Sequence, residues 1–95
     1  ERAITPRTCA FLVEPIQARN PAVQPRAFLH ELRRLTAARG IALVFDDVLL
    51  GFRLHQGGSQ AFFDVRADLA TYGKILGGGL PIGVIGGSAR YLDAI

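Results

Sequence analysis

Lys74 and the glycines that follow it have the clearest capacity for chemistry in this sequence. The chain has 95 residues, and Lys74 is the single lysine among its eleven lysine and arginine residues. An arginine guanidinium stays protonated, whereas a lysine amine can lose its proton and attack a carbonyl carbon. Gly77, Gly78 and Gly79 let a ligand come close to the backbone, because glycine has no Cβ. We hypothesise that Lys74 forms an imine with an aldehyde cofactor, although a lone lysine after a glycine is also typical of a solvated loop.

A carboxylate, Asp46, is the second candidate group. It directly follows the apolar run of residues 41–45. If the cofactor has a pyridine ring, a carboxylate must keep the ring nitrogen protonated, so that the ring can accept electrons from a substrate carbanion. Lys74 and Asp46 would together supply both groups that such chemistry requires.

Two apolar runs and a helix between them would position Asp46. Residues 9–13 and 41–45 are continuous apolar runs, which are typical of strands buried on both faces of a parallel sheet. The segment from Pro25 to Gly40 predicts an amphipathic helix, with Phe28, Leu32 and Leu35 on its apolar side. Strand, helix and strand form a right-handed βαβ unit.

The ends of these strands indicate where a ligand would bind. Glu14 follows the first run and Asp46 follows the second. In open parallel sheets, ligands bind beyond the carboxyl ends of the strands. We therefore expect Glu14 and Asp46 to face one crevice.

The remainder of the chain predicts two more strands and a final helix. Residues 69–72 form a short strand that ends at Gly73-Lys74, and residues 82–85 form a fourth, which Gly86-Gly87 terminates. Residues 49–60 are expected to be a loop, followed by a short helical turn at 61–63. Ser88 is a suitable N-cap for a helix that continues to Ile95.

Composition excludes several classes of protein. The net charge is +3, but the arginines are scattered and are not interleaved with aromatic residues, which argues against nucleic-acid binding. No apolar run approaches the ~20 residues of a membrane span, and no signal peptide is visible. Cys9 is alone, so neither an internal disulfide nor a cysteine metal cluster is expected. We predict a buried thiol and a reducing, cytoplasmic setting.

Motifs along nearly the whole chain resemble the pyridoxal-phosphate core of class III aminotransferases, the fold-type-I group that includes glutamate-1-semialdehyde aminomutase. The matching motifs are Val13-Glu14-Pro15-Ile16-Gln17, Phe45-Asp46-Asp47-Val48, Gly51-Phe52-Arg53, Gly57-Gly58, Asp68-Leu69, and Thr71-Tyr72-Gly73-Lys74 to Gly77-Gly78-Gly79-Leu80-Pro81-Ile82-Gly83. The resemblance implies an α/β fold: residues 1–95 would be a fragment of the large cofactor-binding domain, a mostly parallel sheet in a three-layer α/β/α arrangement. The missing initial Met also suggests a piece of a longer protein.

The resemblance also implies roles for particular residues. Lys74 would bind pyridoxal 5'-phosphate as a Schiff base, Asp46 would pair with the pyridinium nitrogen, Val48 would pack on one face of the ring, and Glu14 would shape the cavity. No metal is implied. Asp47 and Leu50 depart from the family, which usually has Glu and Thr there, so the contacts of this loop are expected to differ.

The implied activity is transfer of an amino group from an amino-acid donor to a keto or aldehyde acceptor, within a homodimer. Residues 14–29 resemble a narrower group, the aminotransferase domains of polyketide and peptide synthases, whose acceptor would be a β-ketoacyl chain on a carrier protein. An aminomutase and a noncatalytic fragment remain alternatives. A nucleotide-binding module fits poorly, because Ile75 stands where a phosphate loop needs Ser or Thr after its lysine.

Overall fold

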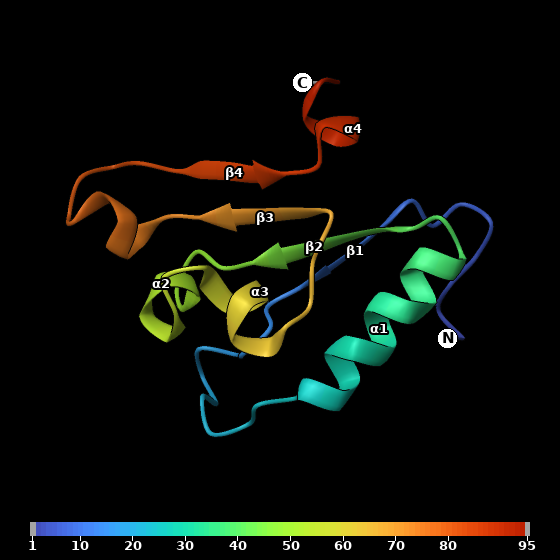
Figure 1. Cartoon of the computed structure of the whole chain (residues 1–95), viewed down its shortest axis with the longest axis horizontal. Coiled ribbons are helices and arrows are strands. Elements are labelled where there is room, and N and C mark those ends of the chain that lie inside the picture. The colour runs from blue at the N-terminus through green and yellow to red at the C-terminus, as the bar shows by residue number, and fades with distance from the viewer. Residues whose placement is uncertain (1, 95) are drawn as a thin grey trace.

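A four-stranded mixed sheet is the centre of the structure, a computed structural model that describes residues 2–94. The strands lie in the order β1-β2-β3-β4 (Figure 1). The first three are parallel, and β4 is antiparallel to β3. The elements in chain order are β1 (Ala10–Val13), α1 (Arg26–Ala38), β2 (Ala42–Asp46), α2 (Gly51–Leu54), α3 (Gly58–Phe63), β3 (Leu69–Tyr72), the 3-10 helix η1 (Lys74–Gly77), β4 (Val84–Gly87) and α4 (Ala89–Leu92).

The helix α1 connects the parallel strands β1 and β2, as the apolar pattern predicts. Its buried residues are Leu29, Leu32 and Thr36. Leu32 is buried as expected, whereas Leu29 and Thr36 are buried in place of Phe28 and Leu35. Phe28 is 51% exposed. The buried Thr36 hydroxyl donates to the Leu32 carbonyl oxygen at 2.9 Å, which satisfies it inside the helix.

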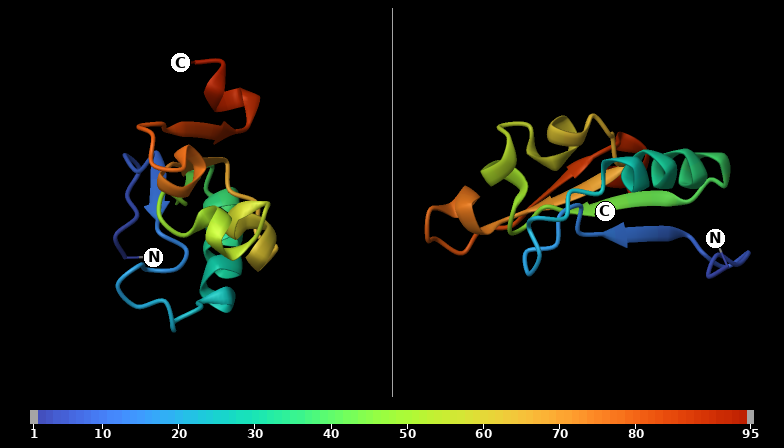
Figure 2. Two further views of the ribbon diagram at one scale, coloured as in Figure 1. Left: turned by 90° about the vertical axis from the view of Figure 1, so that its left-hand side faces the viewer. Right: turned by 90° about the horizontal axis from the view of Figure 1, so that it is seen from below.

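One face of the sheet carries the core. Leu29 and Leu32 of α1 pack with Leu43 and Phe45 of β2 and with Phe63 of α3. Figure 2 shows α1, α2 and α3 on the same side of the sheet. Residues 2–94 therefore form two layers at this part of the sheet, and the third layer of the expected α/β/α arrangement is not formed by them.

The opposite face of the sheet is apolar but uncovered. Leu12 of β1 is 66% exposed and Ile85 of β4 is 54% exposed. The sequence predicts strands that are apolar on both faces, and both faces do carry apolar side chains. Within residues 2–94, only the helical side buries them.

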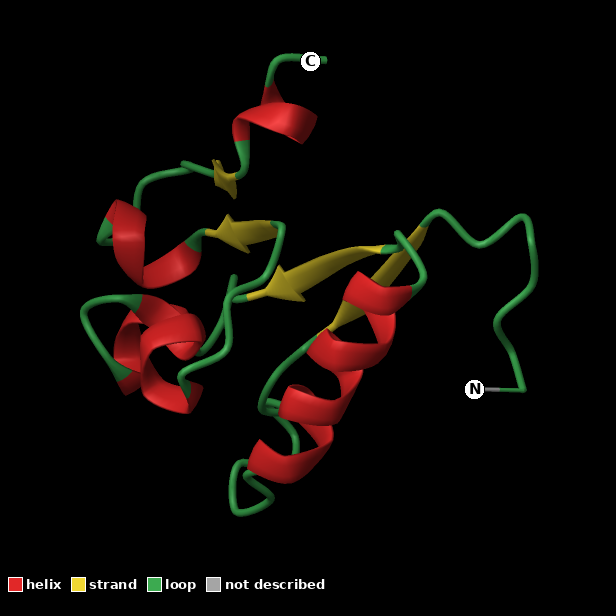
Figure 3. Ribbon diagram, turned by 45° about the vertical axis from the view of Figure 1, so that its right-hand side comes forward, coloured by secondary structure: helices red, strands yellow, loops and turns green. Residues whose placement is uncertain are grey.

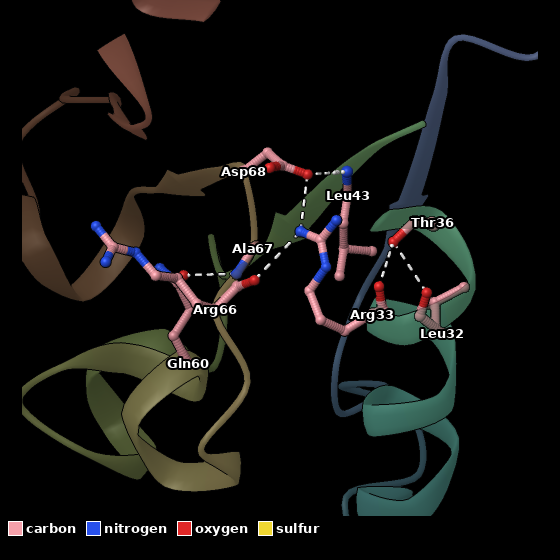
Figure 4. A network of polar contacts seen from close by, with 8 residues as sticks. All are labelled: Leu32, Arg33, Thr36, Leu43, Gln60, Arg66, Ala67 and Asp68. Atoms are coloured by element: carbon pink, nitrogen blue, oxygen red, sulfur yellow. Dashed lines mark hydrogen bonds and ion pairs between the residues drawn. The ribbon is translucent and has the colours of Figure 1, made fainter. Parts of the chain in front are cut away.

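One carboxylate oxygen joins α1, β2 and the start of β3. Oδ2 of Asp68 accepts a hydrogen bond from the Leu43 backbone N–H at 2.7 Å and an ion-paired hydrogen bond from Arg33 Nη1 at 2.8 Å (Figure 4). The Asp68 N–H also donates to the Leu43 carbonyl oxygen at 2.8 Å, and the Asp68 carbonyl oxygen accepts from Ser88 N–H at 2.9 Å. Asp68 therefore sets where β3 begins.

The structure differs from the sequence expectation at several places. β4 comprises residues 84–87, not 82–85, and Gly86 and Gly87 pair with Ala70 and Leu69 instead of ending the strand. A Cβ on Gly87 would collide with the Asp68 carbonyl oxygen, so glycine is required by close strand approach.

Two further expectations about local structure are wrong. The segment 49–60 is not a simple loop, because it contains α2 and half of α3. Cys9 is exposed, not buried. The helix after Ser88 is present as α4 but is shorter than expected, because it ends at Leu92 and residues 93 and 94 form a turn; Ile95 lies outside the described residues. Between residues 2 and 94, no helix is both long enough and apolar enough to cross a bilayer.

Removal of the Asp68 carboxylate should destabilise the fold. Asp68→Ala leaves the Leu43 N–H without its acceptor and the Arg33 guanidinium with the Arg66 carbonyl oxygen in place of an ion pair, so we expect the free energy of unfolding of the full-length protein to fall by about 2–3 kcal/mol. Chemical unfolding measures this change. As a control, Glu31→Gln disrupts the exposed Glu31–Arg34 ion pair and should cause no measurable change. Equal stability of Asp68→Ala and the wild type would contradict the assigned role.

Candidate active site

The candidate residues lie at the carboxyl edge of the parallel strands. Figures 1 and 3 show the arrowheads of β2 and β3 pointing toward the side where α2 and η1 lie. Val13 is paired with Phe45, so Glu14 follows β1 beside the end of β2. Asp46 is the last residue of β2 and pairs with Thr71. Lys74 is the first residue of η1, directly after Gly73.

Alternation of side chains along β2 places Asp46 on the uncovered face of the sheet. Leu43 and Phe45 point to the helical side, so Asp46 shares the uncovered face with Val44. Asp46 is half-buried, and its Oδ1 accepts from the Val48 N–H at 3.1 Å. Glu14 Oε1 accepts from the Ala18 N–H at 2.9 Å. Each carboxylate is thus oriented by a backbone N–H of its own loop.

Lys74 has a backbone conformation that is uncommon for a residue with a side chain. Its φ is +44°, and Asp64 is the other non-glycine residue with positive φ in the described part of the chain. Asp64 has a structural reason, because it ends α3 and its N–H bonds to Gln60. Lys74 instead begins a helix. Such strain costs roughly 1–3 kcal/mol and clusters at functional sites, so this geometry marks Lys74 independently of its residue type.

A close contact brings the segments that carry Asp46 and Lys74 together. A Cβ on Gly73 would lie 3.3 Å from Val48 Cγ1 and 3.5 Å from the Ile82 carbonyl oxygen. Val48 is two residues after Asp46, and Gly73 is next to Lys74. The structure therefore places an exposed amine and a half-buried carboxylate at the same edge of the sheet.

The three glycines after η1 form a tight reversal of the chain. Gly78 has φ +57° and Gly79 has φ +105°, both in the region that favours glycine. A Cβ on Gly77 would lie 2.6 Å from Ile82 Cγ2. Each glycine thus has a conformational or packing reason in this turn, apart from any contact with a ligand.

Asp47 is a polar residue whose importance the sequence did not reveal. It is 3% exposed, and its Oδ2 accepts from the Ser59 N–H at 2.9 Å. Burial raises the pKa of Asp47, and the Asp46 charge adds to this rise, while the hydrogen bond from the Ser59 N–H acts in the opposite direction. A Cβ on Gly58 would lie 2.8 Å from this oxygen. Gly51 and Gly58, which leave room for the Asp47 side chain, are the signal in the sequence that could have indicated its burial.

These residues can bind and orient a molecule with a carbonyl group and a basic nitrogen. An amine such as that of Lys74 can react with a carbonyl carbon, and a carboxylate such as that of Asp46 can pair with a protonated nitrogen. Across residues 2–94, no group of three or more His, Cys, Asp or Glu side chains could hold a metal ion.

The pH dependence of stability should report the burial of Asp47. Because its pKa in the folded state lies above 3.8, the stability that the neutral carboxyl contributes is complete below pH 3.8 and is lost as pH rises through the raised pKa. Asp47→Asn cannot ionise but can still accept from Ser59. We expect the variant to become more stable relative to the wild type as pH rises toward neutrality.

Chemical unfolding of the full-length protein at several pH values measures this difference. The control is Asp64→Asn, because this carboxylate is exposed and asparagine tolerates the left-handed conformation. Parallel pH profiles of wild type and Asp47→Asn would show that burial of Asp47 does not disfavour its charged form.

Comparison with known proteins identifies the family. The family model described as aminotransferase class-III matches residues 1–95. A glutamate-1-semialdehyde 2,1-aminomutase of Alkaliphilus oremlandii (strain OhILAs) is 46% identical over 87 residues, which cover 90% of this chain and 20% of that protein.

Solved structures give the same result for the fold. An omega-transaminase from Sphaerobacter thermophilus superposes with a TM-score of 0.82 and 41% identity, over 90% of this chain and 20% of that chain. A taurine:2-oxoglutarate aminotransferase from Bifidobacterium kashiwanohense, in complex with PLP and glutamate, has a TM-score of 0.77 and 30% identity over the same shares. The chain spans about a fifth of the length of these relatives. Its α/β fold is that of the fold-type-I transaminases, and the chain belongs to the class III aminotransferase family.

Proposed function

We propose that this chain is part of the cofactor-binding domain of a pyridoxal-phosphate-dependent transaminase, and that Lys74 is the residue that binds the cofactor covalently. The observation that carries the proposal is the single lysine, exposed and held at φ +44°, at the strand edge that also bears Asp46. Two of the similar solved structures, described as a transaminase with PLP bound and an aminotransferase in complex with PLP, support this cofactor.

The residues at the edge fit the chemical groups of pyridoxal phosphate. The Lys74 amine suits its aldehyde, and the Asp46 carboxylate, oriented by the Val48 N–H, suits its pyridine nitrogen. Val48 would pack against one face of the ring, and Glu14 would shape the cavity beside it. When bound, the cofactor supplies a ring that withdraws electrons from the carbon next to the substrate nitrogen.

The chain's own residues would then handle protons. Asp46 keeps a proton on the ring nitrogen, because a carboxylate beside it favours the charged form. Once the substrate amine has displaced it, Lys74 Nζ would remove the proton from the substrate α-carbon as a base and then donate it, as an acid, to the cofactor carbon to which Lys74 had been attached. Because Lys74 is exposed, its amine is accessible to both the cofactor and the substrate.

The proposed substrates are an amino-acid donor and a keto or aldehyde acceptor. The resemblance of residues 14–29 to synthase-embedded domains favours an acceptor on a carrier protein. The exposed apolar face of the sheet, with Leu12 and Ile85, supports a chain that functions inside a larger, dimeric enzyme. We place that enzyme in the cytoplasm.

An aminomutase is the second candidate function. It is favoured by the 46% identity to a protein named glutamate-1-semialdehyde 2,1-aminomutase. The two activities differ in whether the amino group leaves its molecule. Experiments that establish the cofactor therefore do not distinguish a transaminase from an aminomutase.

Covalent labelling of Lys74 tests the proposed function directly. Borohydride treatment of the full-length holoenzyme should add a phosphopyridoxyl group to Lys74, and trypsin should then leave the peptide from Ala67 to Arg90 uncut. Mass spectrometry identifies this peptide. Lys74→Arg should abolish the label and lower kcat by about 10²–10⁴-fold or more, because the guanidinium cannot replace the amine as nucleophile and base.

A control for this experiment is Arg53→Lys, which adds a lysine on the exposed side of α2. The new lysine should remain unlabelled while Lys74 is labelled as before. A holoenzyme whose label is absent from Lys74 would contradict the proposal.

Isotope transfer separates the transaminase from the aminomutase. With ¹⁵N-labelled amino-acid donor and an unlabelled 2-oxo acid, we expect the full-length enzyme to deliver ¹⁵N to the acceptor, as followed by mass spectrometry. With glutamate-1-semialdehyde alone, a transaminase should not accumulate a product whose amino group has moved to the neighbouring carbon. Efficient formation of that product without an acceptor would favour the aminomutase.

A further inference from the structure

Two consecutive residues of α3 contact the ends of two neighbouring strands. The Ser59 N–H donates to Asp47 Oδ2 at 2.9 Å, and Asp47 directly follows β2. Gln60 Nε2 donates to the Tyr72 hydroxyl at 3.2 Å, and Tyr72 is the last residue of β3. The Asp47 N–H also donates to the Thr71 carbonyl oxygen at 3.0 Å, which joins the two strand ends to each other.

The Tyr72 ring is fixed on several sides. It stacks on Phe52 of α2, with ring centroids 4.9 Å apart and planes 24° apart. Three glycines line the rest of its surroundings. A Cβ would lie 3.2 Å from the ring at Gly58, 3.4 Å at Gly51 and 3.7 Å at Gly86. The ring therefore packs against Phe52 on one side and lies near the backbone of these glycines, which limits how far the end of β3 can move.

Gln60 is held in one orientation by its own contacts. Its Oε1 accepts from the Ala67 N–H at 2.9 Å (Figure 4), so its Nε2 is directed to Tyr72. Its backbone oxygen accepts from the Val65 N–H at 3.0 Å. The half-buried amide is thus a rigid link between the segment before β3 and the end of β3.

Each residue that α3 holds adjoins a residue of the proposed site. Asp47 is next to Asp46, and Gly73 alone separates Tyr72 from Lys74. We propose that α3 positions the site by fixing the spacing between Asp46 and Lys74, with Gln60 and Tyr72 as the positioning residues for Lys74. This inference rests on the proposed function, since it assigns supporting residues to the same site.

The backbone of Lys74 explains why such support is needed. A non-glycine residue at φ +44° is retained only where its surroundings determine the conformation. The exposed Gly78–Gly79 turn on the other side of η1 offers little restraint, because a Cβ at either glycine would meet no atom within 4 Å. Restraint on Lys74 therefore comes from the Tyr72 side and from the contacts of Gly73 and Gly77 with Ile82, and the Tyr72 side is the one that α3 holds.

A double-mutant cycle in the full-length holoenzyme tests the link. Tyr72→Phe removes one oxygen and keeps the stacked ring, and Gln60→Leu removes the amide. We expect each to lower kcat by about 3–10-fold with KM for the amino donor unchanged, and the double variant to be no slower than the slower single variant, because residues in contact are coupled. Tyr91→Phe, the same change in α4, is the matched control and should leave kcat unchanged.

Hydrogen exchange of the cofactor-free protein provides a readout that does not depend on activity. Peptides covering residues 73–82 should exchange faster in Tyr72→Phe and Gln60→Leu than in the wild type and in Tyr91→Phe. Tyr72→Phe keeps the test decisive if Gln60→Leu does not fold, since it removes a single atom.

The results distinguish failure of the proposed function from failure of the positioning role alone. A wild-type enzyme without borohydride label on Lys74 overturns the proposed function and the positioning role with it. A labelled wild type whose variants show unchanged kcat, or multiplicative losses in the double variant, overturns the positioning role alone. Faster exchange with unchanged kcat also overturns it, because the link would then support only the fold.

Discussion

The alignment of β2 with β3 is the constraint on which the site depends, and the Asp68 carboxylate anchors it. One oxygen of Asp68 binds α1 through Arg33 and β2 through the Leu43 N–H. Because β3 begins at the next residue, this contact sets the register of the two strands. Asp46 then falls beside Thr71, and the chain reaches Lys74 three residues later. Asp68 thus influences the geometry of the proposed site from the opposite end of β3.

The alternation of side chains along β2 gives two adjacent carboxylates different environments. Asp47 turns toward the helices, where it is buried and accepts the Ser59 N–H. Asp46 turns toward the face that residues 2–94 leave uncovered. The strand period therefore leaves Asp46 half-buried on the open face and buries Asp47, which is consistent with the proposal that Asp46 is the carboxylate that meets the cofactor. A sequence motif alone could not make this choice, because the two residues are identical in type.

Sequence patterns predicted the elements whose stability comes from burial along a regular period. The apolar runs at 9–13 and 41–45 and the short predicted strand at 69–72 became β1, β2 and β3 within one residue, and α1 lies where its helical spacing indicates. The family and the α/β fold were also predicted correctly, from motifs in residue order. The roles of Lys74, Asp46, Val48 and Glu14 remain predictions.

The sequence could not predict the elements that depend on contacts between distant segments. β4 includes Gly86 and Gly87, which local propensity assigns to a break, yet they pair because strands approach closely there. The short helices α2 and α3 begin at glycines and are held by tertiary contacts with Asp47 and Tyr72. Cys9 precedes β1, an edge strand with one uncovered face, which explains its exposure.

Several glycines of this chain therefore allow close packing and do not act as flexible points. Gly51, Gly58 and Gly86 surround one aromatic ring, although they are far apart in the sequence and lie on three different elements. A Cβ at Gly58 would be tight against the Tyr72 ring, at 3.2 Å, and a Cβ at Gly51 or Gly86 would be in van der Waals contact with it. Gly73 alone separates Tyr72 from Lys74. The packing of the Tyr72 ring close to these glycines therefore helps to fix where the only lysine side chain of the sequence lies.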